Sequence, residues 1–231
     1  MIRDVFITET NCITPLGFTL ETNIQNIENG ISGIRLHENS EMMKTPFYAS
    51  IIEDEILNSA FAKVSKSTDF TRLEKMMILA LQPIVEKSNV DLNSKTGLIL
   101  STTKGNITAL KNQTEENLKS AHLSDLAKKV FSFFGFQTQP IVVSNACVSG
   151  ILAVSVAKRL IQSELYDNVL IVAGDEVSEF VLSGFTSFQA ISDLPCKPYS
   201  KNRTGVTLGE AATAVLVSAN AENTKVKVIG D

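Results

Sequence analysis

Ser144-Asn145-Ala146-Cys147-Val148-Ser149-Gly150 joins a short apolar run to an amphipathic segment with almost no loop between them. The run, residues 141–144, is typical of a buried strand, and residues 151–161 have helical spacing. Cys147 is therefore predicted in the first turn of a helix, where unpaired N–H groups and the helix dipole favour a thiolate. The same N–H groups can hold the oxyanion that forms when a thioester is attacked. This pattern indicates a nucleophile elbow with cysteine in place of serine.

Several of these side chains also have plainer explanations. Free cysteines are usually small buried apolar residues, and the local pattern alone leaves this alternative open for Cys147. Ser149, at the helix start, is expected to bond to the backbone rather than to a substrate. Phe185 and Phe188 are one turn apart on a predicted helix, and a core stripe is expected there rather than the lining of an acyl pocket.

Strands and helices alternate along the rest of the chain, which implies parallel crossovers and a three-layer α/β/α domain. One helix is expected to be capped by Asp69 and to kink or end early at Pro83. The predicted strands cover residues 5–8, 47–52, 97–100, 141–144, 168–174, 211–218 and 225–229. The other predicted helices cover residues 22–29, 106–117, 122–134, 151–161 and 178–191.

The composition excludes several classes of function. The chain has 231 residues and a formal net charge of −4, without the clustered Lys and Arg that nucleic-acid binding requires. No apolar stretch reaches the roughly 18 residues of a membrane span, and the amino terminus is not that of a signal peptide. Cys12, Cys147 and Cys196 lie far apart without a CxxC, and only His37 and His122 could supplement them at a metal site. Free thiols in a reducing, cytoplasmic compartment are therefore expected.

The Cys147 stretch is one of several motifs spread over almost the whole chain. The others are residues 7–17 (ITETNCITPLG), 29–34 (NGISGI), 172–176 (VAGDE), 184–192 (GFTSFQAIS) and 196–212 (CKPYSKNRTGVTLGEAA). In this order they resemble the motifs of β-ketoacyl synthases, whose nucleophile signature reads Thr-Ala-Cys-Ala/Ser-Ser-Gly. Departures at Glu9, Asn145, Ser200 and Thr204 suggest a divergent branch and leave the acyl chain length and the pathway open.

The resemblance implies an α/β fold, a three-layer α/β/α thiolase-like half with a five-stranded mixed sheet. Residues 1–231 would form the amino-terminal domain, with an insertion-rich region at about 35–135, and the carboxyl-terminal half is expected to be absent. In the family that half supplies two histidines, a lysine and a second oxyanion N–H for malonyl decarboxylation and condensation. His37 and His122 match no catalytic motif, so solvated or core-filling roles are expected for both. Structural roles are likewise expected for Arg203 and Glu210.

The resemblance also implies an acyltransferase with Cys147 as its catalytic nucleophile and without a cofactor or metal. Cys147 would accept an acyl group from acyl carrier protein. With a second half, it would join that group to a carbanion from malonyl carrier protein with loss of CO₂, in fatty-acid or polyene and polyketide synthesis. The expected partners are carrier protein and, in a homodimer or heterodimer, a further condensing-enzyme subunit. A non-catalytic binding or dimerisation partner is the main alternative, because a cysteine hydrolase would lack a histidine placed to act as base.

Overall fold

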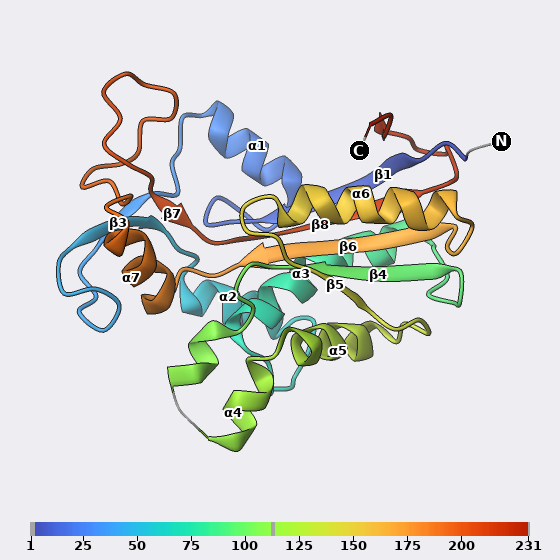
Figure 1. Ribbon diagram of the computed structural model, residues 1–231, viewed down its shortest axis with the longest axis horizontal. Coiled ribbons are helices and arrows are strands. Elements are labelled where there is room, and N and C mark those ends of the chain that lie inside the picture. The colour runs from blue at the N-terminus through green and yellow to red at the C-terminus, as the bar shows by residue number, and fades with distance from the viewer. Residues whose placement is uncertain (1–2, 112–113, 231) are drawn as a thin grey trace.

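The computed structural model describes residues 3–111 and 114–230, and its centre is a six-stranded mixed sheet (Figure 1). Across the sheet the strands are β5 (Ile141–Val143), β4 (Thr96–Ser101), β6 (Asn168–Asp175), β8 (Ala211–Ser218), β1 (Phe6–Ile13) and β9 (Val226–Lys227). β4 lies parallel to both β5 and β6, whereas β8 lies antiparallel to β6 and to β1. The carboxyl ends of β4, β5 and β6 therefore meet at one end of the sheet, here called the carboxyl end. In open α/β sheets this is the end at which ligands bind.

β9 is the strand that the expected five-stranded sheet lacked, so that prediction was wrong by one strand. β8 leaves the other edge of β1 open, and the chain returns along this edge, where Val226 pairs with Ile7. Val228 extends the contact by donating its N–H to the Val5 carbonyl at 2.8 Å. This pairing satisfies backbone groups of β1 that would otherwise form an open edge.

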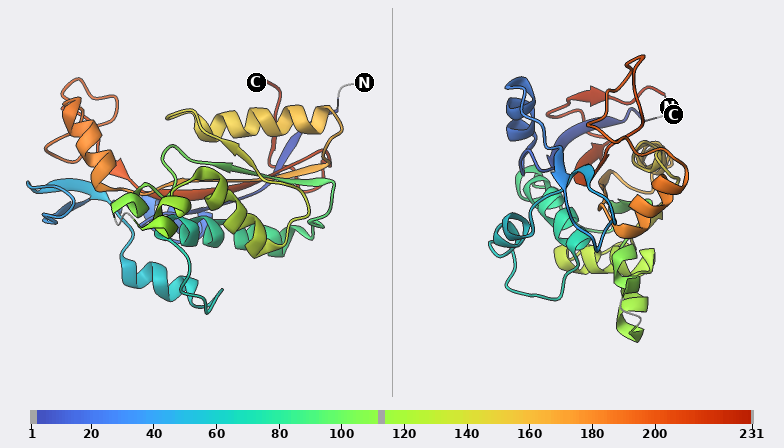
Figure 2. Two further views of the ribbon diagram at one scale, coloured as in Figure 1. Left: turned by 60° about the horizontal axis from the view of Figure 1, so that its bottom comes forward. Right: turned by 90° about the vertical axis from the view of Figure 1, so that its left-hand side faces the viewer.

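The side chains of β4 explain the layers, because successive residues of a strand point to opposite faces of a sheet. Leu98 and Leu100 pack into the core beneath α3 and α5, whereas Ile99 packs beneath α6. These helices are α3 (Arg72–Ser88), α5 (Leu123–Phe134) and α6 (Ser149–Gln162). Figure 2 (left) shows α6 on one side of the sheet and α3 and α5 on the other. The predicted three-layer α/β/α architecture is confirmed.

A second sheet of three strands lies beyond the carboxyl end of the large sheet (Figure 1). Its strands are β2 (Arg35–His37), β3 (Phe47–Ser50) and β7 (Leu208–Gly209), and only Glu210 separates β7 from β8. The remaining helices are α1 (Leu20–Glu28), α2 (Asp54–Phe61), the 3₁₀ helix η1 (Ile107–Lys111), α4 (Glu115–Ser120) and α7 (Glu179–Ser187). The helix predicted over 106–117 is thus divided into η1 and α4, and residues 112–113 lie outside the described residues. No helix of the described ranges is long and apolar enough to cross a membrane.

α3 differs from its prediction at both expected boundaries. Thr71, not Asp69, is its cap, in a capping box in which Thr71 and Glu74 satisfy each other's backbone N–H groups. Pro83 neither ends nor shortens the helix, which continues to Ser88. Proline removes one backbone hydrogen bond there, but α3 is buried against the sheet along most of its length, so packing outweighs that loss.

Candidate active site

Cys147 lies in the turn between β5 and α6, at the carboxyl end of the large sheet. β5 ends at Val143 and α6 begins at Ser149, with Val148 as its cap residue. Cys147 is exposed, which excludes the alternative of a small buried apolar residue. The sequence predicted Cys147 within the first helical turn, but the residue lies just before that turn. The thiol is nevertheless at the amino-terminal end of α6, where the helix dipole favours negative charge.

The Ser149 side chain stabilises the turn by hydrogen bonding to backbone groups on both sides of Ala146. Its Oγ accepts a hydrogen bond from the Asn145 N–H at 2.8 Å and donates one to the Ala146 carbonyl at 2.7 Å. Ser149 is buried, so these two hydrogen bonds are shielded from water. The expectation that Ser149 bonds to the backbone is confirmed.

Ala146 holds the strained position of the turn. Its φ is 45°, in the left-handed region that side chains other than glycine rarely adopt. Such a conformation costs about 1–3 kcal/mol and persists only where the surroundings impose it. Backbone bonds from Val148 to Asn145 and from Ser149 to Ala146, at 3.2 and 3.3 Å, impose it here together with the Ser149 hydroxyl. The turn therefore presents Cys147 in one fixed backbone geometry.

Asp175 holds the neighbouring loop, which follows β4 at the same end of the sheet. Its carboxylate accepts hydrogen bonds from the Thr102 hydroxyl at 2.8 Å, from the Thr103 N–H at 3.0 Å and from the Lys104 N–H at 3.2 Å. Asp175 is the last residue of β6, so this carboxylate ties two neighbouring strand ends together. Sequence reasoning missed this role, although an acidic residue directly after a buried strand was its signal.

Residues 2–223 match the family model of the β-ketoacyl synthase N-terminal domain. The chain belongs to the β-ketoacyl synthase family. The matched range contains the whole Cys147 turn and both strand ends described above. Comparison with curated proteins by sequence gives no match.

Solved ketosynthases have the same fold at low sequence identity. The ishigamide ketosynthase/chain length factor is 19% identical, with a TM-score of 0.83 over 100% of this chain and 63% of its own. A β-ketoacyl synthase from Burkholderia phymatum is 17% identical, with a TM-score of 0.76 over 94% of this chain and 59% of its own. The ketosynthase ApeO with its chain length factor ApeC, from Xenorhabdus doucetiae, is 18% identical, with a TM-score of 0.74 over 94% and 58%. The thiolase-like fold is thus confirmed, and the chain spans about three fifths of the length of these structures.

The late block of this β-ketoacyl synthase family chain has a structural role at Glu210, as expected. The Glu210 side chain is fully buried and accepts hydrogen bonds from the Ile52 N–H at 2.6 Å and from Arg72 Nε at 3.2 Å. Arg203, by contrast, is exposed, and its side chain donates to the Ser200 carbonyl of its own turn at 3.1 Å. Both side chains bond to backbone groups, which agrees with the structural roles that were expected for them.

Glu176 is a second buried carboxyl group at this end of the sheet, and it bonds to the Thr108 hydroxyl. Burial raises its pKa above the ordinary value, and the charge of Glu210 raises it further, although Thr108 and Arg72 act in the opposite direction. Glu176, Thr108 and Arg72 line a pocket of about 320 Å³ between η1 and α3. A carboxyl group in such surroundings holds its proton to a higher pH than an exposed one.

Neither histidine is a catalytic candidate. His37 is half-buried, stacks on Phe47 with 5.5 Å between ring centroids and bonds to the Ala49 carbonyl at 3.2 Å. His122 is the cap residue of α5.

Phe188 was expected in a core stripe, but 82% of it is exposed, because α7 ends at Ser187 and leaves Phe188 outside its packed face.

The other two thiols differ from Cys147 in exposure. Cys12, on β1, and Cys196, in the loop before β7, are both half-buried. Burial raises the pKa of the Cys12 thiol, and the charge of Glu21 raises it further. A thiol with a raised pKa is a poor nucleophile at neutral pH.

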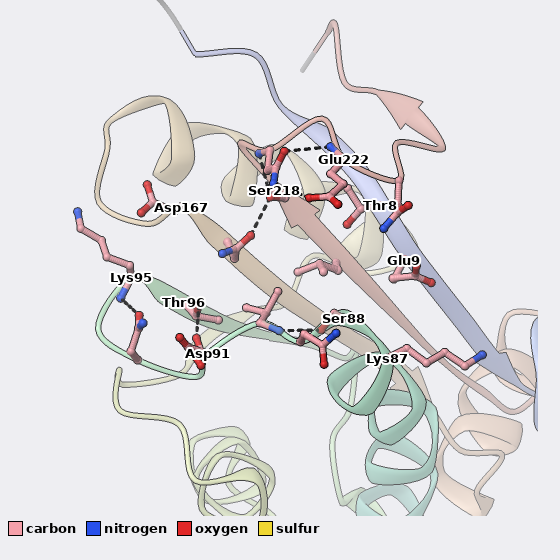
Figure 3. A pocket seen from close by; sticks show the side chains of 17 residues that line it. Thr8, Glu9, Lys87, Ser88, Asp91, Lys95, Thr96, Asp167, Ser218 and Glu222 are labelled. Atoms are coloured by element: carbon pink, nitrogen blue, oxygen red, sulfur yellow. Dashed lines mark hydrogen bonds between the residues drawn. The ribbon is translucent and has the colours of Figure 1, made fainter.

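A polar pocket of about 520 Å³ opens at the end of the sheet opposite to Cys147 (Figure 3). Its lining includes two lysines and four carboxylates, so the wall carries groups of both charges: Lys87, Lys95, Glu9, Asp91, Asp167 and Glu222. Its distance along the sheet from the Cys147 turn separates it from the candidate active site.

Proposed function

We propose that residues 1–231 form the amino-terminal half of a β-ketoacyl synthase and that Cys147 is its acyl-accepting nucleophile. The observation that carries this proposal is an exposed cysteine in a strained strand-to-helix turn, in a chain whose family match extends over residues 2–223. The thiol lies at the amino-terminal end of α6, which carries the positive pole of the helix dipole, and the carboxyl groups of Glu210 and Asp175 bond to backbone N–H groups.

The first step is transfer of an acyl group from carrier protein to Cys147. The Cys147 thiolate attacks the thioester carbonyl carbon, and the electron pair of the C=O bond moves to the oxygen. The resulting oxyanion is held by the Cys147 N–H, with a second donor to come from the other half of the enzyme. The oxyanion collapses, the bond to the carrier sulfur breaks, and the carrier thiolate leaves and takes up a proton.

The second step is condensation and requires the other half. Malonyl carrier protein loses CO₂, and the electron pair of the broken bond forms an enolate. The enolate carbon attacks the acyl group on Cys147 and expels the Cys147 thiolate, which leaves a β-ketoacyl group on the carrier. This step serves fatty-acid or polyketide synthesis and uses acyl carrier protein as partner. A type II polyketide carrier protein has been seen in complex with its own ketosynthase, AntDE, which has the same fold as this chain.

We further propose that the chain pairs with a second condensing-enzyme subunit, identical or different. β5 is an edge strand bonded only to β4, so its other side is open to a partner strand. Ile151, 71% exposed on the first turn of α6, adds apolar surface beside it. The ketosynthase ApeO was solved in complex with a chain length factor. A purely non-catalytic subunit is the second candidate, and exposure of Cys147 favours the catalytic one.

The test is to incubate the chain with an octanoyl thioester of N-acetylcysteamine and to follow its intact mass. We expect the slow gain of one octanoyl group, mapped to Cys147 and lost in Cys147→Ser. With malonyl carrier protein we expect a β-ketoacyl product only after a separately expressed second half is added. Acylation at Cys12 or Cys196 instead would contradict the assignment of Cys147 as the nucleophile. Product from the 231-residue chain alone would overturn the division of labour between the halves.

A further inference from the structure

Ser149 is bonded to the peptide group that this half of the enzyme contributes to the proposed acylation step. Its hydroxyl donates to the Ala146 carbonyl at 2.7 Å, and its own N–H reaches the same oxygen at 3.3 Å. That carbonyl belongs to the peptide unit whose other end is the Cys147 N–H. No peptide bond of the described chain is cis, so the carbonyl and the N–H of this planar unit point in opposite directions.

We propose that Ser149 is a positioning residue that aims the Cys147 N–H at the oxyanion of the acylation step. This inference rests on the proposed function. By fixing the direction of the Ala146 carbonyl, the hydroxyl fixes the direction of the N–H opposite to it. A hydrogen bond to the carbonyl also polarises the amide and strengthens its N–H as a donor, by about 10–30% in condensed-phase estimates.

The hydrogen bond that the Ser149 hydroxyl accepts fixes the direction in which its own proton points. The Asn145 N–H donates to Ser149 Oγ at 2.8 Å, which leaves the hydroxyl proton directed at the Ala146 carbonyl. The two bonds lie on either side of Ala146, whose φ of 45° would otherwise relax toward an ordinary conformation. Rotation of this peptide would turn the Cys147 N–H away from the reacting carbonyl.

Two reactions of the same sulfur atom separate this role from a merely structural one. Acylation by a thioester passes through an oxyanion and needs the N–H. Alkylation by iodoacetamide displaces iodide from a saturated carbon and forms no oxyanion. A residue that aims the N–H therefore affects acylation far more than alkylation, whereas loss of structure affects both.

The experiment compares both rates at Cys147 in wild type, Ser149→Ala and the shape-matched pair Ser149→Thr and Ser149→Val. We expect the acylation-to-alkylation ratio to fall about tenfold in the Ala and Val variants, less than the 10²–10³ of a donor removed outright, because the backbone bond to Ala146 remains. The Thr variant keeps the hydroxyl and should keep the ratio. Ser163→Ala is the matched control, since that hydroxyl bonds the Leu160 carbonyl at the far end of α6.

An unchanged ratio in both Ala and Val variants, or an equal loss of both rates, would overturn the role of Ser149 while leaving Cys147 as nucleophile. Should the Ala variant fail to fold, the Thr and Val pair decides the same question. If wild-type Cys147 is alkylated but never acylated, the proposed function fails and the role of Ser149 falls with it.

Discussion

Arg72 and Glu210, 138 positions apart in sequence, form an ion pair in which the glutamate side chain is fully buried. Arg72 begins α3 and also bonds to Asp54 and to the Ile52 carbonyl, while Glu210 links the two sheets. This one pair therefore joins a helix, a loop and both sheets at the carboxyl end of the large sheet.

Removal of the arginine should be strongly destabilising. Arg72→Met leaves Glu210 buried without its counter-charge, and breaking such a pair costs about 3–5 kcal/mol. Urea unfolding followed by circular dichroism measures the loss. Arg203→Met, on the surface, is the matched control and should change the free energy of unfolding by less than about 0.5 kcal/mol. A loss below about 1 kcal/mol for Arg72→Met would show that Glu210 finds other partners.

Glu176 should make the protein less stable as the pH rises. The pKa of Glu176 is higher in the folded protein than the ordinary value of 4.5. Between pH 4.5 and the pKa of the folded state, the unfolded chain has therefore released a proton that the folded chain still holds. The cost is absent below pH 4.5 and complete above the pKa of the folded state. Glu176→Gln, which can still accept from Thr108, should therefore gain more stability over wild type at pH 8 than at pH 4.

Urea unfolding of both proteins at the two pH values measures this difference, because titration of all other groups cancels. Glu179→Gln alters an exposed carboxylate three residues along the chain and serves as control. If Glu176→Gln raises the free energy of unfolding by the same amount at pH 4 and pH 8, then Glu176 does not hold its proton to a higher pH in the folded state.

Cys147 should be the most reactive of the three thiols in folded protein. It is exposed at a helix start, whereas burial raises the pKa of Cys12 and Cys196 is half-buried. Iodoacetamide labelling at several pH values, mapped by peptide mass, measures the three rates. Faster labelling of Cys12 or Cys196 at pH 7 would show that the nucleophile is misplaced; a folding check by circular dichroism accompanies each sample.

Gly97 should not tolerate a side chain. A Cβ there would lie 2.7 Å from two ring atoms of the buried Tyr166, and overpacking of this kind costs about 1–3 kcal/mol. Gly184, inside α7, has open space around its Cβ position, so Gly184→Ala should be neutral or stabilising by up to about 1 kcal/mol. Thermal and urea unfolding of the two variants tests the contrast, and equal stabilities would refute it.

The isolated chain should associate with itself or with a partner subunit. β5 has one open edge, and Val148 and Ile151 near it are exposed apolar side chains, which is the kind of surface that a partner subunit covers. Sedimentation velocity at micromolar concentration measures the assembly. A clean monomer that binds no dye specific for apolar surface would count against the proposed pairing.

Local features of this molecule were predictable, and long-range ones were not. The strand, turn and helix around Cys147 are contiguous, so their pattern is written in one short stretch of sequence. The Arg72–Glu210 pair and the bonds from Asp175 to Thr103 depend on segments that meet only in the fold. The strand predicted over residues 225–229 does form, as the two-residue β9, but its place beside β1 as a sixth strand of the large sheet depends on the fold and was not part of the five-stranded prediction.

The two wrong boundaries of α3 have different causes, tertiary packing at Pro83 and an overlooked local signal at Thr71. Pro83 is a helix breaker by its own chemistry, yet α3 passes through it because most of that helix is buried. Thr71 and Asp69 are both good caps, and Glu74, three residues after Thr71, decides between them by completing the capping box. Ala146 gave no signal of its strained backbone, since alanine carries no preference for a positive φ.

The position of β1 in the sheet also sets the order in which the protein can be built. β1 is synthesised before the other strands of the large sheet, but its long partner is β8, which begins roughly 200 residues later. At about 5–20 residues per second, β1 waits some 10–40 s for its partner to be synthesised. The nascent chain therefore carries β1 unpaired throughout that interval, and the large sheet is completed only after both β8 and β9 have been synthesised.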